Sequence, residues 1–462
     1  MPDPTRLSDL VSSILELAER KPGQPAIVHR DTQLMYSELA AAVRATAARL
    51  GPEPGTVGVH VAHRPDTVVD LLGIWAAGGT YLPIDPAFPA ERQRQMRDAA
   101  ASTEPDAAYI LFTSGSTGAP KPVATPRRAI ATTVAALRGL FGITPADRVL
   151  QFASLSWDTC FEEILPTLTG GATLVFDDET HTGSFPRFLR AVRRQAISVL
   201  DLPSAYWHEL VLHLVSTGEP LPERLRLVII GGEPVNPARL ADWRRLDTGR
   251  IRLLNTYGCT ETTLITHAVD LHGPAADPCA GTPIGRPLPH VHEKLSEDGE
   301  LLIGGPALAL GYHRLPDATA ARFVEVDGDR FFRTGDRVSR RPDGCLLYEG
   351  RLDGELKIRG IRVNPAEVEA NIAAHPSISG VAVVGVPLAG HTVLAAYLVP
   401  QPGVDADGLD TDVRRFLRER APAHLIPARI SIVSALAYTA SGKVDRAGSH
   451  RRFAAAVGQE ER

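Results

Sequence analysis

The first 270 residues alternate between two hydrophobic patterns. Leu10, Ile14 and Leu17 recur at helical spacing and predict an amphipathic helix over 8–20. Short apolar runs bounded by polar or turn-forming residues predict buried strands at 26–28, 57–59, 80–83, 109–112, 197–200, 225–230 and 251–254. Helical patterns that alternate with buried strands are typical of mostly parallel sheets covered by helices.

The pattern changes twice beyond residue 270. From about 280 to 350, turns rich in Gly, Pro and Asp follow one another closely and predict a small β-barrel subdomain. The polar segment 350–354 predicts a domain boundary. We therefore predict an α/β protein, in which 1–352 form a large domain of two helix-covered sheets plus this subdomain. A small, mobile α+β C-terminal domain is expected over 353–462, with helices at 365–374 and 411–420 and strands at 380–386 and 393–399.

The bulk properties of the chain exclude several classes of protein. A length of 462 residues, with 44% hydrophobic and 22% charged residues, fits a globular protein of more than one domain. The net charge of −5 argues against nucleic acid as a partner. No apolar run reaches the roughly 20 residues that span a bilayer, so no membrane partner is expected. The four cysteines show neither metal-ligand nor disulfide spacing, and no signal peptide is visible, so we expect a cytoplasmic location.

A hydroxyl-rich loop follows the predicted strand at 109–112. Hydroxyl and glycine residues alternate through Thr113, Ser114, Gly115, Ser116, Thr117 and Gly118, and Lys121 follows. Glycines let backbone N–H groups turn inward and hydroxyls add further donors, which together suit a phosphate. The spacing is not that of a Walker A loop. Taken alone, this composition also suits a flexible linker.

Lysine is rare in this chain. The 49 basic residues include only five lysines, at positions 21, 121, 294, 357 and 443. Lys121, Lys357 and Lys443 all lie in polar segments that contain glycine. A lysine retained where arginine is otherwise used indicates a need for a compact ammonium group.

With these motifs in view, the chain resembles the AMP-forming adenylating superfamily, which includes acyl-CoA synthetases, firefly-type luciferases and the adenylation domains of nonribosomal peptide synthetases. Eight segments match in the family's order, at 34–39, 75–85, 113–121, 255–261, 299–305, 333–336, 350–360 and 441–446. The forms Tyr-Leu-Pro-Ile-Asp at 81–85 and Gly-Lys-Val-Asp-Arg at 442–446 are most similar to those of amino-acid adenylation domains. No carrier site with flanking helices follows Lys443, so the resemblance is to a free-standing form.

The resemblance implies that a carboxylate is joined to the α-phosphate of ATP, with Mg²⁺ bound and pyrophosphate released. The loop at 113–118 and Lys121 would hold the phosphates, Glu261 would help to hold Mg²⁺, and Lys443 would bridge the two substrates. The other nucleotide-binding positions it implies are Gly232, Glu233, Pro234, Tyr257, Gly258, Thr260, Asp336 and Arg351, with Tyr257 stacked on adenine and Asp336 on the ribose. From the residues alone, Tyr257 is equally a core aromatic and Asp336 a turn residue.

A second step is also implied by the resemblance. The small domain would turn about Asp353 and present the surface around Lys357 and Gly360 to the phosphopantetheine thiol of a separate carrier protein. A glycine-flanked hinge suits such a rotation. Dependence on a small activator protein is left open by the sequence.

Acidic residues mark the expected substrate pocket. Asp158 and Glu162 lie four apart on one helical face, and Asp201 interrupts an apolar segment. The resemblance assigns Asp158 to the substrate ammonium and Glu162 and Asp201 to the side-chain pocket. Its remaining substrate-binding positions are Thr159, Ile229, Gly231, Thr256, Leu264 and Ile265. Two desolvated carboxylates call for a cation, so we predict a basic amino acid, with lysine or β-lysine ahead of ornithine and arginine.

Three alternatives stay open at this point. Glu162 or Asp201 could point to solvent or pair with a nearby arginine. The chain could be an acyl-CoA-type ligase for another carboxylic acid, although Asp158 argues against a substrate that has no ammonium group. It could also be a catalytically silent homologue that only binds a partner, although the retained residues Lys121, Glu261, Asp336 and Lys443 argue against this.

Overall fold

The computed structural model describes residues 7–99, 101, 104, 106–113, 120–274, 276, 281–352, 354–358, 360–388, 391–438 and 444–457. The chain divides into two compact units. The first comprises Met1–Asp85, Arg97–Leu111 and Pro122–Leu352, and the second comprises Pro86–Met96, Phe112–Lys121 and Asp353–Arg462. Each unit has a hydrophobic core of its own and is described separately below.

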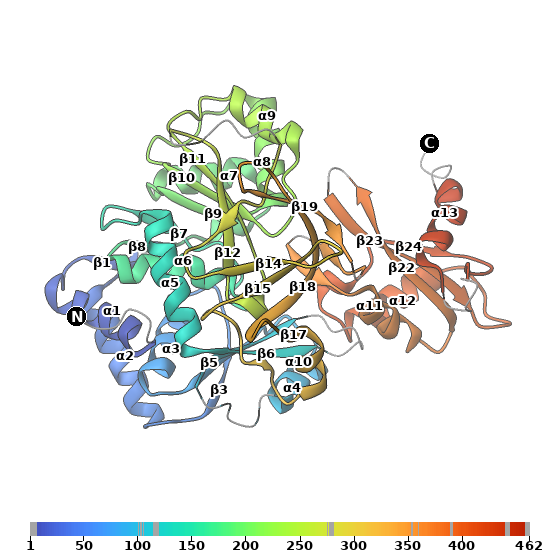
Figure 1. Ribbon diagram of the computed structural model, residues 1–462, viewed down its shortest axis with the longest axis horizontal. Helices are drawn as coiled ribbons and strands as arrows, with labels where there is room; N and C mark the ends of the chain where they lie inside the picture. Colours follow the sequence, from blue (N-terminus) through green and yellow to red (C-terminus); the bar gives the residue numbers. More distant parts are fainter. Residues whose placement is uncertain are drawn as a thin grey trace. The chain divides into compact units, whose positions relative to one another are not determined.

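A nine-stranded sheet forms the centre of the first unit (Figure 1). In spatial order its strands are β13 (Arg286–Pro287), β12 (Ile265–His272), β11 (Arg252–Gly258), β10 (Leu227–Gly231), β9 (Val199–Pro203), β7 (Arg148–Leu150), β8 (Thr173–Phe176), β1 (Pro25–His29) and β2 (Thr32–Met35). The strands from β11 to β1 pair in parallel, as the alternating helix and strand pattern predicts, and antiparallel strands close both edges.

A five-stranded sheet and a layer of helices face the inner side of this large sheet. The strands are β16 (Gly311–Tyr312), β6 (Lys121–Pro126), β5 (Ala107–Thr113), β4 (Thr80–Ile84) and β3 (Thr56–His60). The helices are α1 (Leu7–Arg20), α2 (Tyr36–Leu50), α3 (Pro65–Ala76), α5 (Arg127–Phe141) and α6 (Thr159–Gly170). Their apolar faces share one core with both sheets, and helix α6 packs beside β7 and β8 of the large sheet.

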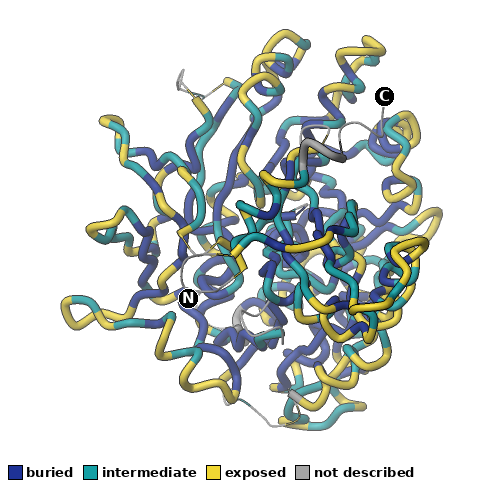
Figure 2. Tube along the Cα trace, turned by 90° about the vertical axis from the view of Figure 1, so that its right-hand side faces the viewer, coloured by how far each residue is buried: buried dark blue, intermediate teal, exposed yellow. Residues whose placement is uncertain are grey.

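The outer side of the large sheet is covered by α7 (Phe185–Arg194), α8 (Ser204–Thr217) and α9 (Pro237–Arg245). Their side chains form a second core with alternate residues of β9 and β10. Leu200 and Leu202 face this outer core, whereas Val199 and Ile229 face the inner one. Buried segments therefore run through the sheets, and exposed residues gather at loop tips and outer turns (Figure 2). Among the described helices, none has the length and apolar character that crossing a bilayer would require.

Residues 286–351, where we expected a barrel, contribute an antiparallel sheet with the order β14–β15–β18–β17, and a fifth strand, β19, pairs with β18. The elements are β14 (His292–Leu295), β15 (Glu300–Gly304), α10 (Pro316–Arg322), β17 (Phe323–Val326), β18 (Asp329–Arg340) and β19 (Leu346–Arg351). The long strand β18 brings Asp336 opposite Arg351 of β19. This pairing places two of the predicted nucleotide-binding residues side by side.

The second unit contains the predicted α+β elements. Its three-stranded sheet has the order β22 (Ile378–Leu388), β23 (His391–Pro400) and β24 (Arg429–Ile432). Helices α11 (Pro365–Ala373), α12 (Leu409–Arg418) and α13 (Arg446–Val457) accompany this sheet, together with the hairpin β20 (Leu356–Ile358) and β21 (Ile361–Val363). Val368, Val413 and Leu398 are buried in its core.

The remaining described elements are α4 (Ala90–Ala99) and the short 3-10 helices η1 (Asp178–His181), η2 (Thr260–Thr262) and η3 (Ala423–Leu425).

Two observed strands differ from the predicted ones in ways that affect the site. Strand β9 begins at Val199 and continues through Asp201 to Pro203, so Asp201 lies within the strand and not after its end. Strand β11 extends to Gly258, so Tyr257 also lies within a strand. Pairing with β10 extends β9 through Asp201, and pairing with β12, where Tyr257 lies opposite His267, extends β11. A hydrophobic run alone reveals neither extension.

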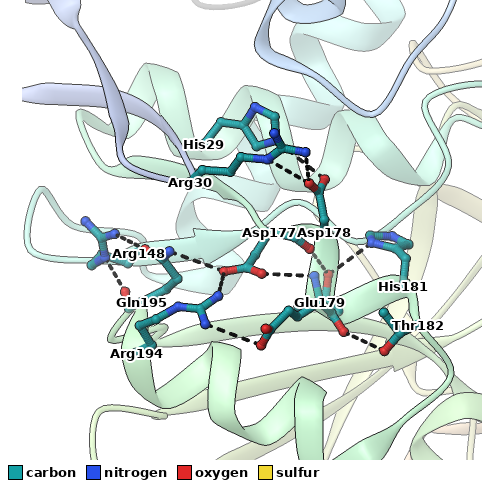
Figure 3. A network of polar contacts seen from close by, with 11 residues as sticks. His29, Arg30, Arg148, Asp177, Asp178, Glu179, His181, Thr182, Arg194 and Gln195 are labelled. Atoms are coloured by element: carbon teal, nitrogen blue, oxygen red, sulfur yellow. Dashed lines mark hydrogen bonds and ion pairs between the residues drawn. The ribbon is translucent and has the colours of Figure 1, made fainter.

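A polar network anchors the turn η1 beside the large sheet (Figure 3). The Arg30 guanidinium pairs with Asp178, and Arg194 of α7 donates to Asp177 at 2.7 Å. His181 ends this turn, and its Nε2 lies 3.0 Å from the carbonyl oxygen of Phe152. The network therefore fixes a turn that contacts the segment leading from β7 toward α6.

Candidate active site

The carboxyl ends of β9, β10 and β11 bring together several of the predicted substrate positions. The pairing register sets Asp201 beside Ile229, and Gly231 between Pro203 and Thr256. Residues paired in this way point to the same face of a parallel sheet, and here that face is the one covered by α6. Ligands of open α/β sheets bind at the carboxyl ends of the strands, so this is the expected end.

Helix α6 presents the other two predicted carboxylates. Asp158 occupies the position before its first residue, has helical backbone angles and makes no capping hydrogen bond with its side chain. Glu162 follows one turn later and is only 9% exposed. The apolar residues Phe161 and Ile164 of the same helix lie in the inner core, which fixes the rotation of the helix.

Glu162 and Asp201 form a buried acidic pair. Burial raises the pKa of Asp201 to about 7. Burial, followed by the charges of Asp201 and Asp158, raises the pKa of Glu162 well above its ordinary value. Burial also raises the pKa of Asp158 to about 6, while a hydrogen bond from Thr260 opposes that rise. All three shifts reflect the cost of keeping a carboxylate away from water, and at Glu162 and Asp158 a neighbouring carboxylate adds to that cost.

Neither member of this pair is neutralised by an arginine of the described part of the chain. Asp201 is 6% exposed, and its Oδ2 is buried without a hydrogen-bond partner. Within the part of the chain that the structure describes, no ion pair or side-chain hydrogen bond involves Glu162 or Asp201. The alternatives of a solvent-facing carboxylate or an arginine pair therefore do not hold. A buried carboxylate without a partner is costly, and a cationic ligand would remove that cost.

Tyr257, Asp336 and Arg351 form a second constellation. The Tyr257 hydroxyl donates to Asp336 Oδ2 at 2.6 Å, and Arg351 Nη1 donates to Asp336 Oδ1 at 3.0 Å. All three side chains are nearly buried. Burial and the Asp336 charge raise the pKa of Tyr257 well above its usual value, so its hydroxyl keeps its proton and acts as a donor. Arg351, one of the predicted nucleotide-binding residues, thus pairs with Asp336 directly.

The backbone around Asp336 is supported by side chains that the sequence did not single out. Glu300 accepts a hydrogen bond from the Gly335 N–H at 2.9 Å and pairs with Arg333 at 2.6 Å. The Thr334 hydroxyl accepts from the Asp336 N–H at 3.0 Å and donates to the Leu301 carbonyl. Asp336 therefore lies within strand β18 and not in a turn, and its backbone is held on both sides.

Glu261 lies in the short helix η2 and is 1% exposed. The Tyr312 hydroxyl donates to its Oε1 at 2.9 Å, and the Ala309 N–H donates to its backbone carbonyl at 2.9 Å. The negative charge of Glu261 contributes to the raised pKa of Asp158, so the two carboxylates are close. A single well-held carboxylate suits Mg²⁺, which takes few protein ligands and completes its shell with phosphate and water. Within the described residues, no group of three or more His, Cys, Asp or Glu side chains could hold a metal by itself.

The turn between β11 and β12 has a strained backbone. Thr263 and Leu264 have φ values of 60° and 65°, in the left-handed region that β-branched and bulky residues rarely adopt. Leu264 and Ile265, two predicted substrate positions, are both buried there. A Cβ on Gly258 would lie 1.9 Å from the Leu264 carbonyl oxygen, so only glycine allows this close approach. Strain of this kind often accompanies a functional site.

The remaining predicted residues fall into three groups. Ser114, Gly115, Ser116, Thr117, Gly118, Asp353 and Lys443 lie outside the described residues. In the first unit, Gly232, Glu233 and Pro234 follow the end of β10, Gly258 ends β11, and Thr159 begins α6. Thr113 ends β5 and Lys121 begins β6, while Lys357 and Gly360 belong to the hairpin of the second unit. Gly360 has a φ of 82°, which fits a glycine in that tight connection.

Two functional candidates escaped the sequence reasoning. Tyr312 lies 51 positions from Glu261, and no spacing rule links the two. Glu163 was not among the predicted residues, although an acidic side chain among the apolar residues at the start of α6 is a usable signal. Only the folded chain shows what each of these side chains contacts.

Comparison with known families agrees with this geometry. The family described as AMP-binding enzyme matches residues 15–104 and 96–313, and its C-terminal domain matches residues 367–443. The chain is 38% identical to isonitrile lipopeptide synthase of Streptomyces coeruleorubidus over 96% of its own length, but it spans only 33% of that relative. It is 33% identical to novobiocin biosynthesis protein H of Streptomyces niveus, covering 95% of this chain and 82% of the relative.

A solved structure shows the same fold over most of the chain. It is an artificially fused adenylation–PCP di-domain, NpsA-ThdA from Klebsiella oxytoca, which is 25% identical to this chain. The TM-score is 0.80, with coverage of 92% of this chain and 93% of the other. The matched domains, the relatives and the arrangement of acidic and aromatic residues agree, and the chain belongs to the AMP-binding enzyme family as an AMP-forming adenylation domain.

Proposed function

We propose that this chain activates an amino acid with a cationic side chain, lysine or β-lysine before ornithine or arginine, as an aminoacyl-adenylate. The activated acyl group then passes to the phosphopantetheine thiol of a separate carrier protein in nonribosomal peptide biosynthesis. The observation that carries the choice of substrate is the pair Glu162 and Asp201, buried together without a cationic partner among the described residues. A substrate ammonium or guanidinium would supply the missing charge.

The apolar surroundings of this pair favour a long side chain. Ile229 lies beside Asp201 in the sheet, and Leu264 and Ile265 are buried in the same core. A methylene chain can pack against such residues while its terminal ammonium reaches the carboxylates. Asp158, one turn before Glu162, would receive the amino group next to the reacting carboxylate.

In the adenylation step, a carboxylate oxygen of the amino acid attacks the α-phosphorus of ATP. The bond from that phosphorus to the bridging oxygen breaks, and its electron pair leaves with pyrophosphate. Tyr257 and Asp336 would orient the nucleoside, and Lys121 with the 113–118 loop would hold the departing phosphates. Lys443 would bridge the two substrates, where a cation stabilises the charge that develops in the transition state.

Mg²⁺ is the expected metal cofactor, with Glu261 as its protein ligand. The hydroxyl of Tyr312 holds one oxygen of Glu261 in place. When bound, Mg²⁺ would neutralise negative charge on the phosphates of ATP. The buried position of Glu261 and its proximity to Asp158 support this assignment.

The second half-reaction consumes the adenylate. A carrier thiolate attacks the acyl carbon, a thioester forms, and AMP leaves with the electron pair of the mixed anhydride. We propose that the C-terminal domain, 353–462, turns about Asp353 for this step and offers the surface around Lys357 and Gly360. Relatives named for peptide synthesis and a solved neighbour that contains a PCP domain support a carrier as partner.

Amino-acid-dependent exchange of labelled pyrophosphate into ATP tests the proposed function. We expect lysine or β-lysine to give the highest kcat/KM in a panel that includes ornithine, arginine, leucine, phenylalanine and aryl acids. Norleucine is the matched neutral control, because it retains the four-carbon chain and lacks the ammonium. A higher rate with leucine or norleucine than with every cationic substrate would refute the acidic recognition. If no amino acid supports exchange, and another carboxylic acid is instead converted to its coenzyme A thioester, the result would favour the acyl-CoA-type ligase.

The pH dependence of binding follows from the raised pKa values. Asp201, with a pKa of about 7, carries a proton below neutrality and ionises above it, whereas lysine stays cationic throughout this range. Because folding raises this pKa, the unliganded protein loses stability as pH rises through about 7, and bound lysine compensates for that loss. We expect the increase in unfolding temperature that lysine produces to be larger at pH 8 than at pH 6. Norleucine serves as the control, and an equal lysine effect at both pH values would contradict this role for Asp201.

A further inference from the structure

Glu163 is a third carboxylate beside the acidic pair, but its surroundings are of the opposite kind. Its Oε1 accepts from the backbone N–H groups of Phe152 and Ala153 at 2.9 and 3.0 Å. Its Oε2 accepts from the Gln151 side-chain amide at 2.9 Å and from the Ala153 N–H at 3.2 Å. The residue is 1% exposed. Every one of these contacts is a donor to the carboxylate, so the site is built for an ionised acceptor.

Glu163 holds the first residues of the loop that leads to Asp158. Residues 151–153 directly follow strand β7, and the chain then turns through 154–158 into α6. The carbonyl oxygens of Gln151 and Phe152 lie 3.0 Å from Nε2 of His63 and of His181 respectively. His181 comes from the anchored turn η1 shown in Figure 3. The N–H groups and the carbonyls of this short segment are therefore held from two sides.

Glu163 and Glu162 have different surroundings because consecutive residues of a helix point about 100° apart. Glu163 binds the segment at 151–153, whereas Glu162 faces the charges of Asp201 and Asp158. Burial and the Asp201 charge raise the pKa of Glu163, and the donors from Ala153, Phe152 and Gln151 oppose that rise. The hydrogen bonds of Glu163 therefore tie the first residues of the loop that carries Asp158 to α6, the helix in which that loop ends.

We propose that Glu163 is a positioning residue for amino-acid recognition: its carboxylate locks residues 151–153 to α6 and thereby sets the places of Asp158 and Glu162. The inference rests on the proposed use of those two side chains in substrate binding. Glu163 itself contacts no substrate. Its loss would displace the recognition groups and leave the nucleotide residues Tyr257 and Asp336, which lie on other elements, in position.

The test compares Glu163→Gln with Glu162→Gln in pyrophosphate exchange and in amide hydrogen exchange. Glu163→Gln keeps the shape but loses the charge-assisted bonds, and places an NH₂ group against N–H donors. We expect the amides of Phe152 and Ala153 to exchange at least about tenfold faster. We also expect the KM for the amino acid to rise about tenfold or more, with the KM for ATP unchanged and the order of preferred amino acids preserved.

Glu162→Gln is the matched control, since it removes a neighbouring buried carboxylate without touching 151–153. It should leave protection of the Phe152 and Ala153 amides unchanged and alter the order of preferred amino acids. Glu163→Asp keeps the charge and shortens the side chain by one methylene, so it answers the same question if the glutamine variant does not fold. An unchanged KM for the amino acid, or an equal rise in both KM values, would overturn the positioning role.

Failure of this inference can be told apart from failure of the proposed function. The kinetic comparison uses whichever amino acid the wild-type protein activates best, whether it is cationic or not. A wild-type protein that prefers a neutral amino acid would refute the proposed substrate class. The positioning role of Glu163 would still be decided by the two KM values and by the exchange of the Phe152 and Ala153 amides.

Discussion

The double variant Glu162→Gln with Asp201→Asn is expected to lower kcat/KM for the cationic amino acid by about 10³-fold, at little cost in stability. Removing the partners of a buried charge costs about 3–5 kcal/mol, and each 1.4 kcal/mol corresponds to a factor of ten. Each single variant should lose less, because one carboxylate can still pair with the ammonium. The preference should shift toward norleucine, which has no charge to leave unpaired.

Stability measurements distinguish this loss of recognition from unfolding. Without substrate, burial raises the pKa of both carboxylates, and the charge of Asp201 raises that of Glu162 further. The neutral amide side chains of the double variant avoid that cost. The unliganded double variant should therefore unfold at the same temperature as the wild type or at a higher one, and the difference should be largest above pH 7. Glu223→Gln, at an exposed carboxylate, should change neither property. Undiminished activity with lysine in the double variant would refute the acidic recognition site.

The second large effect is expected from a single methyl group at Gly258. A Cβ there would meet the carbonyl oxygen of Leu264 at 1.9 Å and its carbonyl carbon at 2.8 Å. Backbone atoms cannot move aside as a flexible side chain would, and Leu264 already has a left-handed conformation. We expect Gly258→Ala to lower the free energy of unfolding by about 3 kcal/mol or more, seen as a lower midpoint in urea or on heating.

Gly139→Ala is the matched control, and we expect it to change the free energy of unfolding in the opposite direction. Gly139 lies inside helix α5, where an added Cβ would meet nothing within 4 Å. Alanine is favoured over glycine in a helix by about 0.5–1 kcal/mol, so this variant should be slightly more stable than the wild type. If Gly258→Ala proved as stable as Gly139→Ala, the close packing of the β11–β12 turn would be contradicted.

The order of elements could be predicted from the chain because each signal is local. The period of apolar residues predicts α1 over 8–20, observed as Leu7–Arg20, and the short run at 80–83 predicts β4, observed as Thr80–Ile84. Strand ends were less accurate where polar residues continue a strand, as Asp201 does in β9 and Tyr257 in β11. There, pairing with a neighbouring strand decides where the strand ends: Asp201 pairs with Ile229 of β10, and Tyr257 pairs with His267 of β12.

The residues of the candidate site could be predicted where they lie in a family motif. Contacts between residues that are distant in sequence were harder to predict. The acidic residues Asp158, Glu162 and Asp201 were named from the chain, and the fold brings them into one electrostatic cluster. The pairing of Asp336 with both Tyr257 and Arg351 was not foreseen. Nor was the contact between Tyr312 and Glu261, because hydrogen bonds between distant segments leave no periodic trace in a sequence.

Residue types and their spacing along the chain were enough to identify the family, the alternation of helices and strands, and the acidic character of the candidate site. Only the packed structure shows which carboxylates have no partner among the described residues and which are held by the protein. Glu162 and Glu163 are adjacent in sequence and chemically identical, yet one faces Asp201 and the other accepts bonds from residues 151–153. Burial and the direction of neighbouring donors make that difference, and both arise only when distant segments pack together.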